Sequence, residues 1–159
     1  MHLTQWTDYA LRVLMYCAAS QTREQPVTIT EIADSYGISR SHLTKVVQDL
    51  AAKGLLETTR GRGGGMRLSK PAGDINLGAV VRATETDFTM VECFDPAVNQ
   101  CRLSLHCGLK GVLSQAMQSY FSVLDGVTLA DLVAPRTATA RMPKSLRSGL
   151  GPGLPATAH

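Results

Sequence analysis

Apolar residues recur at helical spacing near the start of the chain. Within residues 3–20 they are separated by four, three, one and three positions, which places them on one helical face: Trp6, Ala10, Val13, Leu14 and Cys17. Because Cys17 belongs to this apolar stripe, we interpret it as a small core residue. Asp8 and Arg12 lie four residues apart on another face, where a carboxylate and a guanidinium can pair.

Two further helices are predicted after a short loop. Thr28 and Glu31 have the spacing of a capping box, which marks the start of a helix. That helix is expected to end near Gly37, because glycine is suited to the left-handed turn after a helix. Ser39 is expected to cap the next helix, over residues 40–53. Two helices joined by a tight turn predict a helix-turn-helix.

A β-hairpin is predicted directly after the second of these helices. Residues 55–59 and 66–68 have the composition of strands, and the turn between them contains four glycines with Arg60 and Arg62. Such a hairpin, a wing, can bring guanidinium groups close to a phosphate backbone or a narrow minor groove. The turn lacks the spacing of a dinucleotide or phosphate-binding loop, so we expect no nucleotide site.

The remainder of the chain predicts two helices, a long loop and a final helical turn. Asn76 is a good cap for an apolar helix over 77–85, and residues 92–107 show no sustained period. From Leu109 an apolar stripe returns for about sixteen residues. We expect this long helix to pack against a second copy of the chain, with folding back onto its own domain as the alternative. A last turn is predicted over 129–133.

These elements predict a mainly α protein with a winged helix-turn-helix and a long dimerisation helix. We expect a winged helix-turn-helix DNA-binding region over 1–75 and a second region, with the irregular loop and the dimerisation helix, over 76–134. Residues 135–159 contain four Pro, three Gly, four basic residues and no acid, which is typical of a disordered tail.

Composition narrows the class of protein. A chain of 159 residues with 44% hydrophobic and 18% charged residues fits one globular domain and excludes disordered or fibrous classes. No apolar run approaches the roughly 18 residues of a membrane span, and the N-terminus lacks a signal-peptide pattern. We therefore expect a cytoplasmic protein without a membrane partner.

Charge is concentrated in one part of the chain. Residues 40–70 carry seven basic and two acidic side chains, a net charge of +5, inside a chain whose total is +3. A localised basic block in a predicted winged helix-turn-helix favours double-stranded DNA as the partner, although a solvated surface is the alternative. The candidate DNA-binding residues are Thr28, Ser39, Arg40, Ser41, His42, Lys45, Arg60, Arg62 and Arg67.

Three of the four cysteines lie within fifteen residues, in the irregular loop. Seven residues separate Cys93 from Cys101, and five separate Cys101 from Cys107. Zinc sites usually bring their ligands as closely spaced pairs, so these wider gaps favour an iron–sulfur cluster with a fourth, non-cysteine ligand. Free thiols, a disulfide and a zinc site remain alternatives. We expect no enzyme, because His106 is the only histidine near a cysteine and no orienting residue is evident.

Several motifs in order resemble one known family. They are LTQWTDYALRVLMY at residues 3–16, TEIADSYGISRSHLTKVV at 30–47, RGRGGGMRLSKP at 60–71, the three cysteines, and TLADL near residue 130. Over residues 1–134 this pattern resembles the NsrR proteins, which are nitric-oxide-sensing winged-helix repressors in one superfamily with IscR and RirA. IscR-like members carry a histidine three residues after the third cysteine, where this chain has Lys110.

The resemblance implies a set of roles. It implies that Cys93, Cys101 and Cys107 hold an iron–sulfur cluster in a homodimer, with Asp8 of the partner subunit as an oxygen ligand. A 4Fe-4S cluster is favoured and a 2Fe-2S cluster is the alternative. Arg12 and Glu85 are expected to surround the ligands. The implied function is a repressor that releases DNA when nitric oxide reacts with the cluster. An IscR-like or RirA-like regulator of iron or cluster supply is the alternative, followed by a zinc or thiol-redox regulator.

Overall fold

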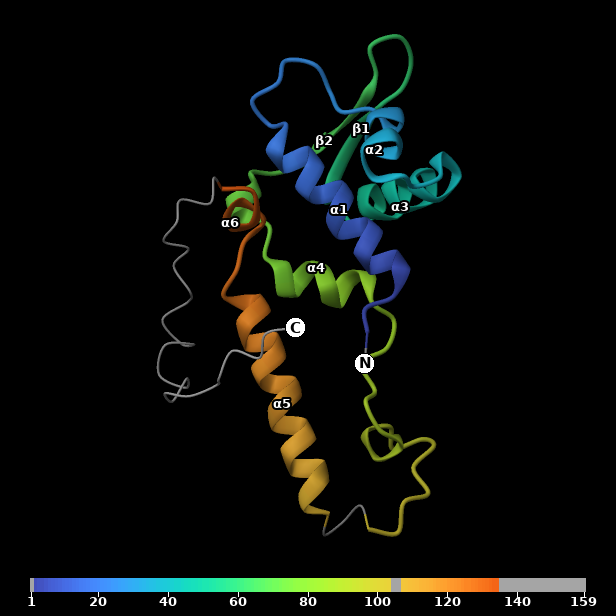
Figure 1. Cartoon of the computed structure of the whole chain (residues 1–159), viewed down its shortest axis with the longest axis vertical. Coiled ribbons are helices and arrows are strands. Elements are labelled where there is room, and N and C mark those ends of the chain that lie inside the picture. Colours follow the sequence, from blue (N-terminus) through green and yellow to red (C-terminus); the bar gives the residue numbers. More distant parts are fainter. Residues whose placement is uncertain (1, 104–106, 135–159) are drawn as a thin grey trace, which may run out of the picture.

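The computed structural model describes residues 2–103 and 107–134 (Figure 1). The expected disordered tail lies outside these residues, as does His106. The fold is mainly helical with one two-stranded sheet, as the sequence predicts. The helices and strands are α1 Gln5–Ala19, α2 Ile29–Tyr36, α3 Arg40–Ala52, β1 Leu56–Thr59, β2 Gly65–Leu68, α4 Leu77–Thr84, α5 Gly108–Asp125 and α6 Leu129–Val133.

Side-chain caps start most of the helices where the sequence predicts. Thr28 and Glu31 form the expected capping box of α2, which ends at Gly37 with a φ of 64°. The side chains of Ser39 and Asn76 accept hydrogen bonds from the first turns of α3 and α4. Two short 3-10 turns, Ala72–Asp74 and Glu92–Phe94, are additions that the sequence pattern does not predict.

One hydrophobic core joins the N-terminal and C-terminal parts of the chain. Leu14 of α1, Leu43 and Leu50 of α3 are fully buried, and Cys17 is 3% exposed, as its place on the apolar stripe predicts. Leu129 of α6 is also buried, and α6 packs against α1. The boundary expected at residue 75 therefore divides elements that share one core.

The wing is an antiparallel pair of strands with an additional residue bound to its edge. In β1 and β2, Leu56 pairs with Leu68 and Thr59 with Gly65. Val27, from the loop before α2, exchanges two backbone hydrogen bonds with Met66, at 3.0 and 2.7 Å. This bridge attaches β2 to the loop before α2, and β1 follows α3 along the chain. Both strands of the wing are therefore connected to the helix-turn-helix.

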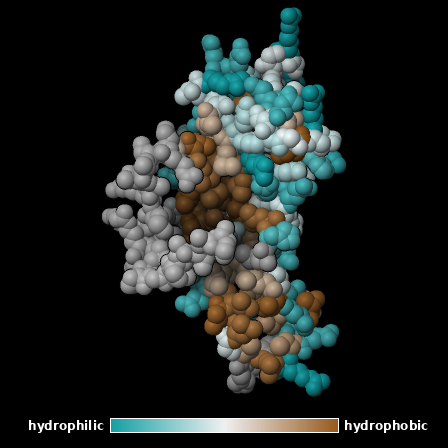
Figure 2. Space-filling model, viewed as in Figure 1, coloured by the Kyte–Doolittle hydropathy of each residue, from teal (hydrophilic) through white to brown (hydrophobic). Residues whose placement is uncertain are grey.

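Helix α5 projects away from the winged region (Figure 1). It is described along its whole length, and in this single chain it contains no buried residue. Leu109 and Val112 are each 62% exposed, and Figure 2 shows hydrophobic surface gathered over this projecting part. A monomer rarely exposes such a surface. Across the described ranges, no helix combines the length and apolarity needed to cross a membrane.

Candidate DNA-binding surface and cysteine segment

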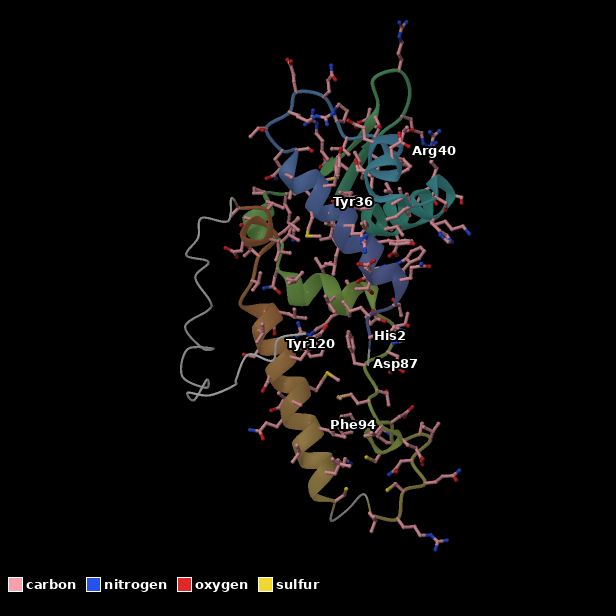
Figure 3. All side chains as sticks on the ribbon, in the orientation of Figure 1. His2, Tyr36, Arg40, Asp87, Phe94 and Tyr120 are labelled. Carbon is pink, nitrogen blue, oxygen red and sulfur yellow. The ribbon has the colours of Figure 1, made fainter. Side chains whose placement is uncertain are left out.

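Helix α3, the second helix of the helix-turn-helix and so its candidate recognition helix, presents the predicted polar residues to solvent. Arg40, Ser41, His42 and Lys45 are exposed, whereas Leu43 between them is buried. Figure 3 shows Arg40 directed away from the body of the protein. This alternation follows from the helical period, because the apolar stripe anchors α3 and leaves the opposite face available to a major groove.

The wing holds two exposed guanidinium groups at its tip. Arg60 and Arg62 are exposed, and Gly61 and Gly63 between and beside them adopt φ values of 95° and 78°. Only glycine adopts such values without strain, so the glycines are required for a tip this tight. A tight, exposed turn with two cations is suited to contact with a phosphate backbone.

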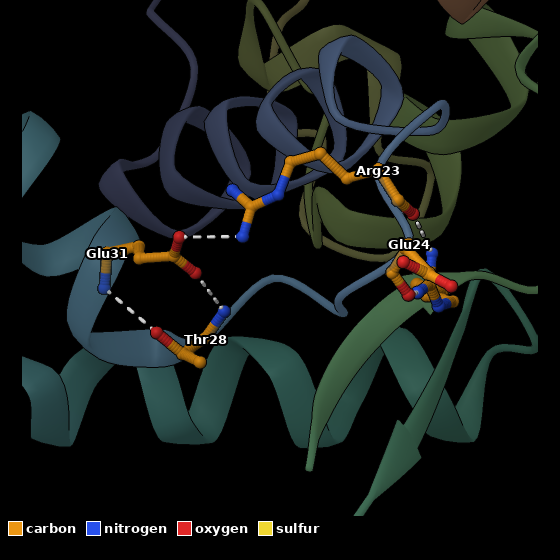
Figure 4. A network of polar contacts seen from close by, with 5 residues as sticks. Arg23, Glu24, Thr28 and Glu31 are labelled. Carbon is orange, nitrogen blue, oxygen red and sulfur yellow. Dashed lines mark hydrogen bonds and ion pairs between the residues drawn. The ribbon is translucent and has the colours of Figure 1, made fainter. Parts of the chain in front are cut away.

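Arg67 has intramolecular partners that the sequence did not indicate. Its guanidinium donates to the backbone carbonyl of Arg23 at 2.9 Å and to the carbonyl of Glu24. Figure 4 shows the adjoining network, in which Arg23 pairs with Glu31 and Glu31 caps the amide of Thr28. Arg67 therefore connects the wing to the loop before α2. Its contact with DNA remains a prediction.

Thr28 and Ser39 both act as helix caps in this structure. Thr28 also lines an open groove between α3 and the wing, together with Gln48 and Arg60. The Ser39 hydroxyl accepts from the amide of His42 at 3.4 Å and remains exposed. Their positions beside the recognition helix are compatible with backbone contacts to DNA, which remain predictions.

The first turns of α1 contain Asp8 and are linked to α4 and α3. Asp8 forms the expected ion pair with Arg12, with 2.9 Å between the carboxylate and the guanidinium. The carboxylate of Glu85 accepts from the backbone amide of Thr4 at 3.1 Å, which joins the end of α4 to the start of α1. The indole of Trp6 donates to Asp49 of α3 at 3.2 Å, a contact that no local sequence signal predicts.

The cysteine segment, residues 85–107, connects α4 to α5. Cys93, Cys101 and Cys107 are free and half-buried, and Cys107 directly precedes α5. The described residues of the segment, 85–103 and Cys107, include none that is buried. Three free thiols, in a segment with no buried side chain among its described residues, are a donor set that fits an iron–sulfur cluster.

The structure of the single chain does not gather these ligands into one site. Within the described residues, no three side chains among His, Cys, Asp and Glu lie close enough to hold a metal. Asp8 pairs with Arg12 instead. Ligation by Cys93, Cys101, Cys107 and Asp8 is therefore a prediction that the fold leaves untested.

Cys17 is expected to react far more slowly than the three cysteines of the segment. Burial raises its pKa to about 12, and the thiolate is the reactive form. In iron-free protein under native conditions, iodoacetamide should label the three half-buried thiols first and Cys17 only after unfolding. Peptide mass spectrometry over a time course measures this order. Equal rates for Cys17 and Cys101 would show that the α1 core opens readily.

Comparisons with known proteins agree with this architecture. A family model described as Rrf2, iron-dependent transcriptional regulator, matches residues 3–135. The HTH-type transcriptional regulator NsrR of Bacillus subtilis is 53% identical over 133 residues, which cover 84% of this chain and 90% of that protein. The oxidized form of Staphylococcus aureus CymR matches with a TM-score of 0.68 at 23% identity, covering 86% of this chain and 99% of that one. IscR of T. potens matches with a TM-score of 0.66 at 24% identity, covering 93% and 96%. These two structures show the fold.

Proposed function

Because this chain belongs to the Rrf2 family of transcriptional regulators, we propose that it is a homodimeric repressor and that nitric oxide relieves its repression through an iron–sulfur cluster. It is a regulator and not an enzyme. The observation that carries the proposal is the combination, in one chain, of an exposed recognition helix, a basic wing and three available thiols beside the projecting helix α5.

The DNA-binding part of the proposal rests on α3 and the wing. Arg40, Ser41, His42 and Lys45, which are exposed, would enter a major groove, and Arg60 and Arg62 would contact the backbone or the minor groove. The exposed apolar surface of α5 supports pairing with a second copy. In a dimer the two recognition helices read half-sites about 34 Å apart.

The sensing part rests on the cysteine segment and on the 53% sequence identity with the NsrR of Bacillus subtilis. The thiolates of Cys93, Cys101 and Cys107 would hold the cluster, with Asp8 of the partner subunit as the fourth ligand. When bound, the cluster supplies iron that reacts with nitric oxide. A carboxylate is a harder and weaker ligand for such iron than a thiolate, so Asp8 would be the ligand most easily released. In the single chain the Asp8 carboxylate pairs with the guanidinium of Arg12, at 2.9 Å.

A single anaerobic titration tests both parts. The absorption spectrum and the anisotropy of a fluorescent operator, obtained by selection from random duplexes, are followed while nitric oxide is added. We expect a visible absorption band at about 400 nm from sulfide-to-iron charge transfer. The band should bleach in parallel with release of DNA.

Other outcomes of this titration separate the alternatives. A band that bleaches without release of DNA, combined with release after iron depletion, would favour an IscR-like or RirA-like regulator of iron or cluster supply. Protein that stays colourless even after incubation with iron and sulfide would leave a DNA-binding protein with zinc or free thiols. Nitric oxide would then have no role in its regulation.

Replacing Asp8 with Ala is expected to leave the visible band and to blunt the response to nitric oxide. The three thiolates would still hold the cluster, but the carboxylate that would link it to the partner subunit, and whose release would carry the signal, is lost. Stopped-flow absorbance and operator anisotropy measure the two effects. Asp34→Ala, which removes an exposed carboxylate from α2, is the control and should respond normally. An unchanged response in Asp8→Ala would remove Asp8 from the ligand set.

A further inference from the structure

Helix α5 is connected to the winged region mainly through α4. Its principal packing partner is α4, and α5 has no buried residue of its own in the described chain. A helix of 18 residues is about 27 Å long, so a tilt of about 10° at its attached end displaces its far end by about 5 Å. Small changes where α4 meets α5 therefore become large changes along the projecting helix.

The attachment is a pair of charges packed on an aromatic ring. Arg82 of α4 donates to both carboxylate oxygens of Asp125 at the end of α5, at 2.6 and 2.8 Å. The same guanidinium lies over the ring of Phe121, 4.2 Å from its centroid. A bidentate contact fixes the relative orientation of the two side chains as well as the distance between them, because both N–H groups must stay in the plane of the carboxylate. We refer to Arg82, Phe121 and Asp125 as the α4–α5 joint.

Neighbouring residues hold the joint in place. Phe88, near the start of the cysteine segment, packs edge-on against Phe121, with 4.9 Å between the ring centroids. The Phe121 ring is therefore in contact with Phe88 as well as with the guanidinium of Arg82. Gly78 leaves room for the pair, because a Cβ there would collide with the Asp125 carboxylate. The side chain of Asn76 donates to the backbone carbonyl of Asp125 at 2.7 Å.

The joint determines geometry more than stability. The side chains of Arg82 and Asp125 are 44% and 46% exposed, and exposed ion pairs contribute little to the free energy of unfolding. The hydrogen bonds from Arg82 lower the pKa of Asp125, so both groups are charged at neutral pH. The close pairing of Arg82 with Asp125, for which Gly78 leaves room, therefore acts mainly on the relative orientation of α4 and α5.

We propose that Arg82 is a positioning residue: through Asp125 and Phe121 it sets the direction in which α5 leaves the winged region, and so the spacing between half-sites that the protein prefers. This inference rests on the proposed function, because only a dimer paired through α5 converts the direction of that helix into a distance between recognition helices. Arg82 itself would touch neither DNA nor the cluster.

The test measures spacing preference directly. An operator is selected from random duplexes with the unsubstituted protein, and variants of it lengthen or shorten the gap between half-sites by one and two base pairs. For Arg82→Met we expect the optimum to shift by at least one base pair or to broaden across the series. Affinity for the original spacing should fall about tenfold, the size of one mismatched base pair. Arg23→Gln, which removes another partly exposed ion pair, this one within the winged region, is the control and should keep the original optimum.

Sedimentation of each protein separates this inference from the proposed function. If the unsubstituted protein is a monomer that binds single half-sites, the proposed dimer is wrong. If Arg82→Met is a dimer with the same optimum and the same relative affinities as the unsubstituted protein, Arg82 has no positioning role. Should Arg82→Met fail to fold, Arg82→Lys carries the same test, because it keeps the charge and loses the bidentate contact. Restoration of the optimum by exchange of the two residues, Arg82→Asp with Asp125→Arg, would further support the inference.

Discussion

Cys101→Ala is expected to remove the visible absorption band and the response to nitric oxide together. Loss of one of three thiolates leaves too few strong ligands for an iron–sulfur cluster. Binding to the selected operator should then fall by about three orders of magnitude or more, toward the non-specific level. Anaerobic absorption and operator anisotropy, measured on the same preparation, check both effects.

Cys17→Ala is the matched control for this experiment. It also removes one thiol, but from the core of α1, where Cys17 is 3% exposed. It should keep the band and the response, with a loss of about 1 kcal/mol in the free energy of unfolding. A Cys101→Ala protein that still shows the band and the response would contradict ligation by the cysteine segment.

Arg62→Ala is expected to weaken binding to every DNA sequence by a similar factor. Each phosphate contact contributes about −0.9 to the slope of log affinity against log salt concentration, so loss of two wing contacts per dimer should make the slope shallower by about 2. The affinity itself should fall about tenfold or more at low salt. Fluorescence anisotropy with selected and random duplexes between low and high salt gives both values.

The same measurement distinguishes the role of Arg67 from that of Arg62. Because Arg67 bonds to the carbonyls of Arg23 and Glu24, Arg67→Lys should disturb the position of the wing and lower affinity with an unchanged salt slope. A shallower slope would mean that Arg67 contacts phosphate as well. Arg23→Gln removes one positive charge outside the wing, as Arg62→Ala removes one from the wing itself, and should leave the slope as it is. If Arg62→Ala reduces affinity for one base pair only, the wing reads sequence and not the backbone.

Most of the fold could be predicted from the sequence because its signals are local. Each helix start except that of α5 carries a side-chain cap, and the capping box at Thr28 and the turn at Gly37 fix the helix-turn-helix within ten residues of chain. The glycines of the wing likewise identify its turn. The two 3-10 turns escaped prediction because three residues are too few to show a period.

The candidate site was predicted as a set of residues, and their contacts were not. Arg62 and Arg40 are exposed as their positions indicate, but Arg67, placed in the same group, bonds to a loop more than forty residues away. Nothing near position 67 signals those carbonyls. The cysteines could be selected by type and spacing alone, but the described residues of the single chain do not gather them into one metal site.

By itself, then, the sequence determined the order of the elements, the buried faces of the helices that form the core and the candidate groups for DNA and metal, because periodicity and capping act over a few residues. Tertiary structure alone decided which distant groups meet: Trp6 with Asp49, Glu85 with the start of α1, and Arg82 with Asp125. Such contacts join residues 43 to 81 positions apart. They exist only after the helices have packed around one core, since packing and not local propensity sets the direction of each side chain.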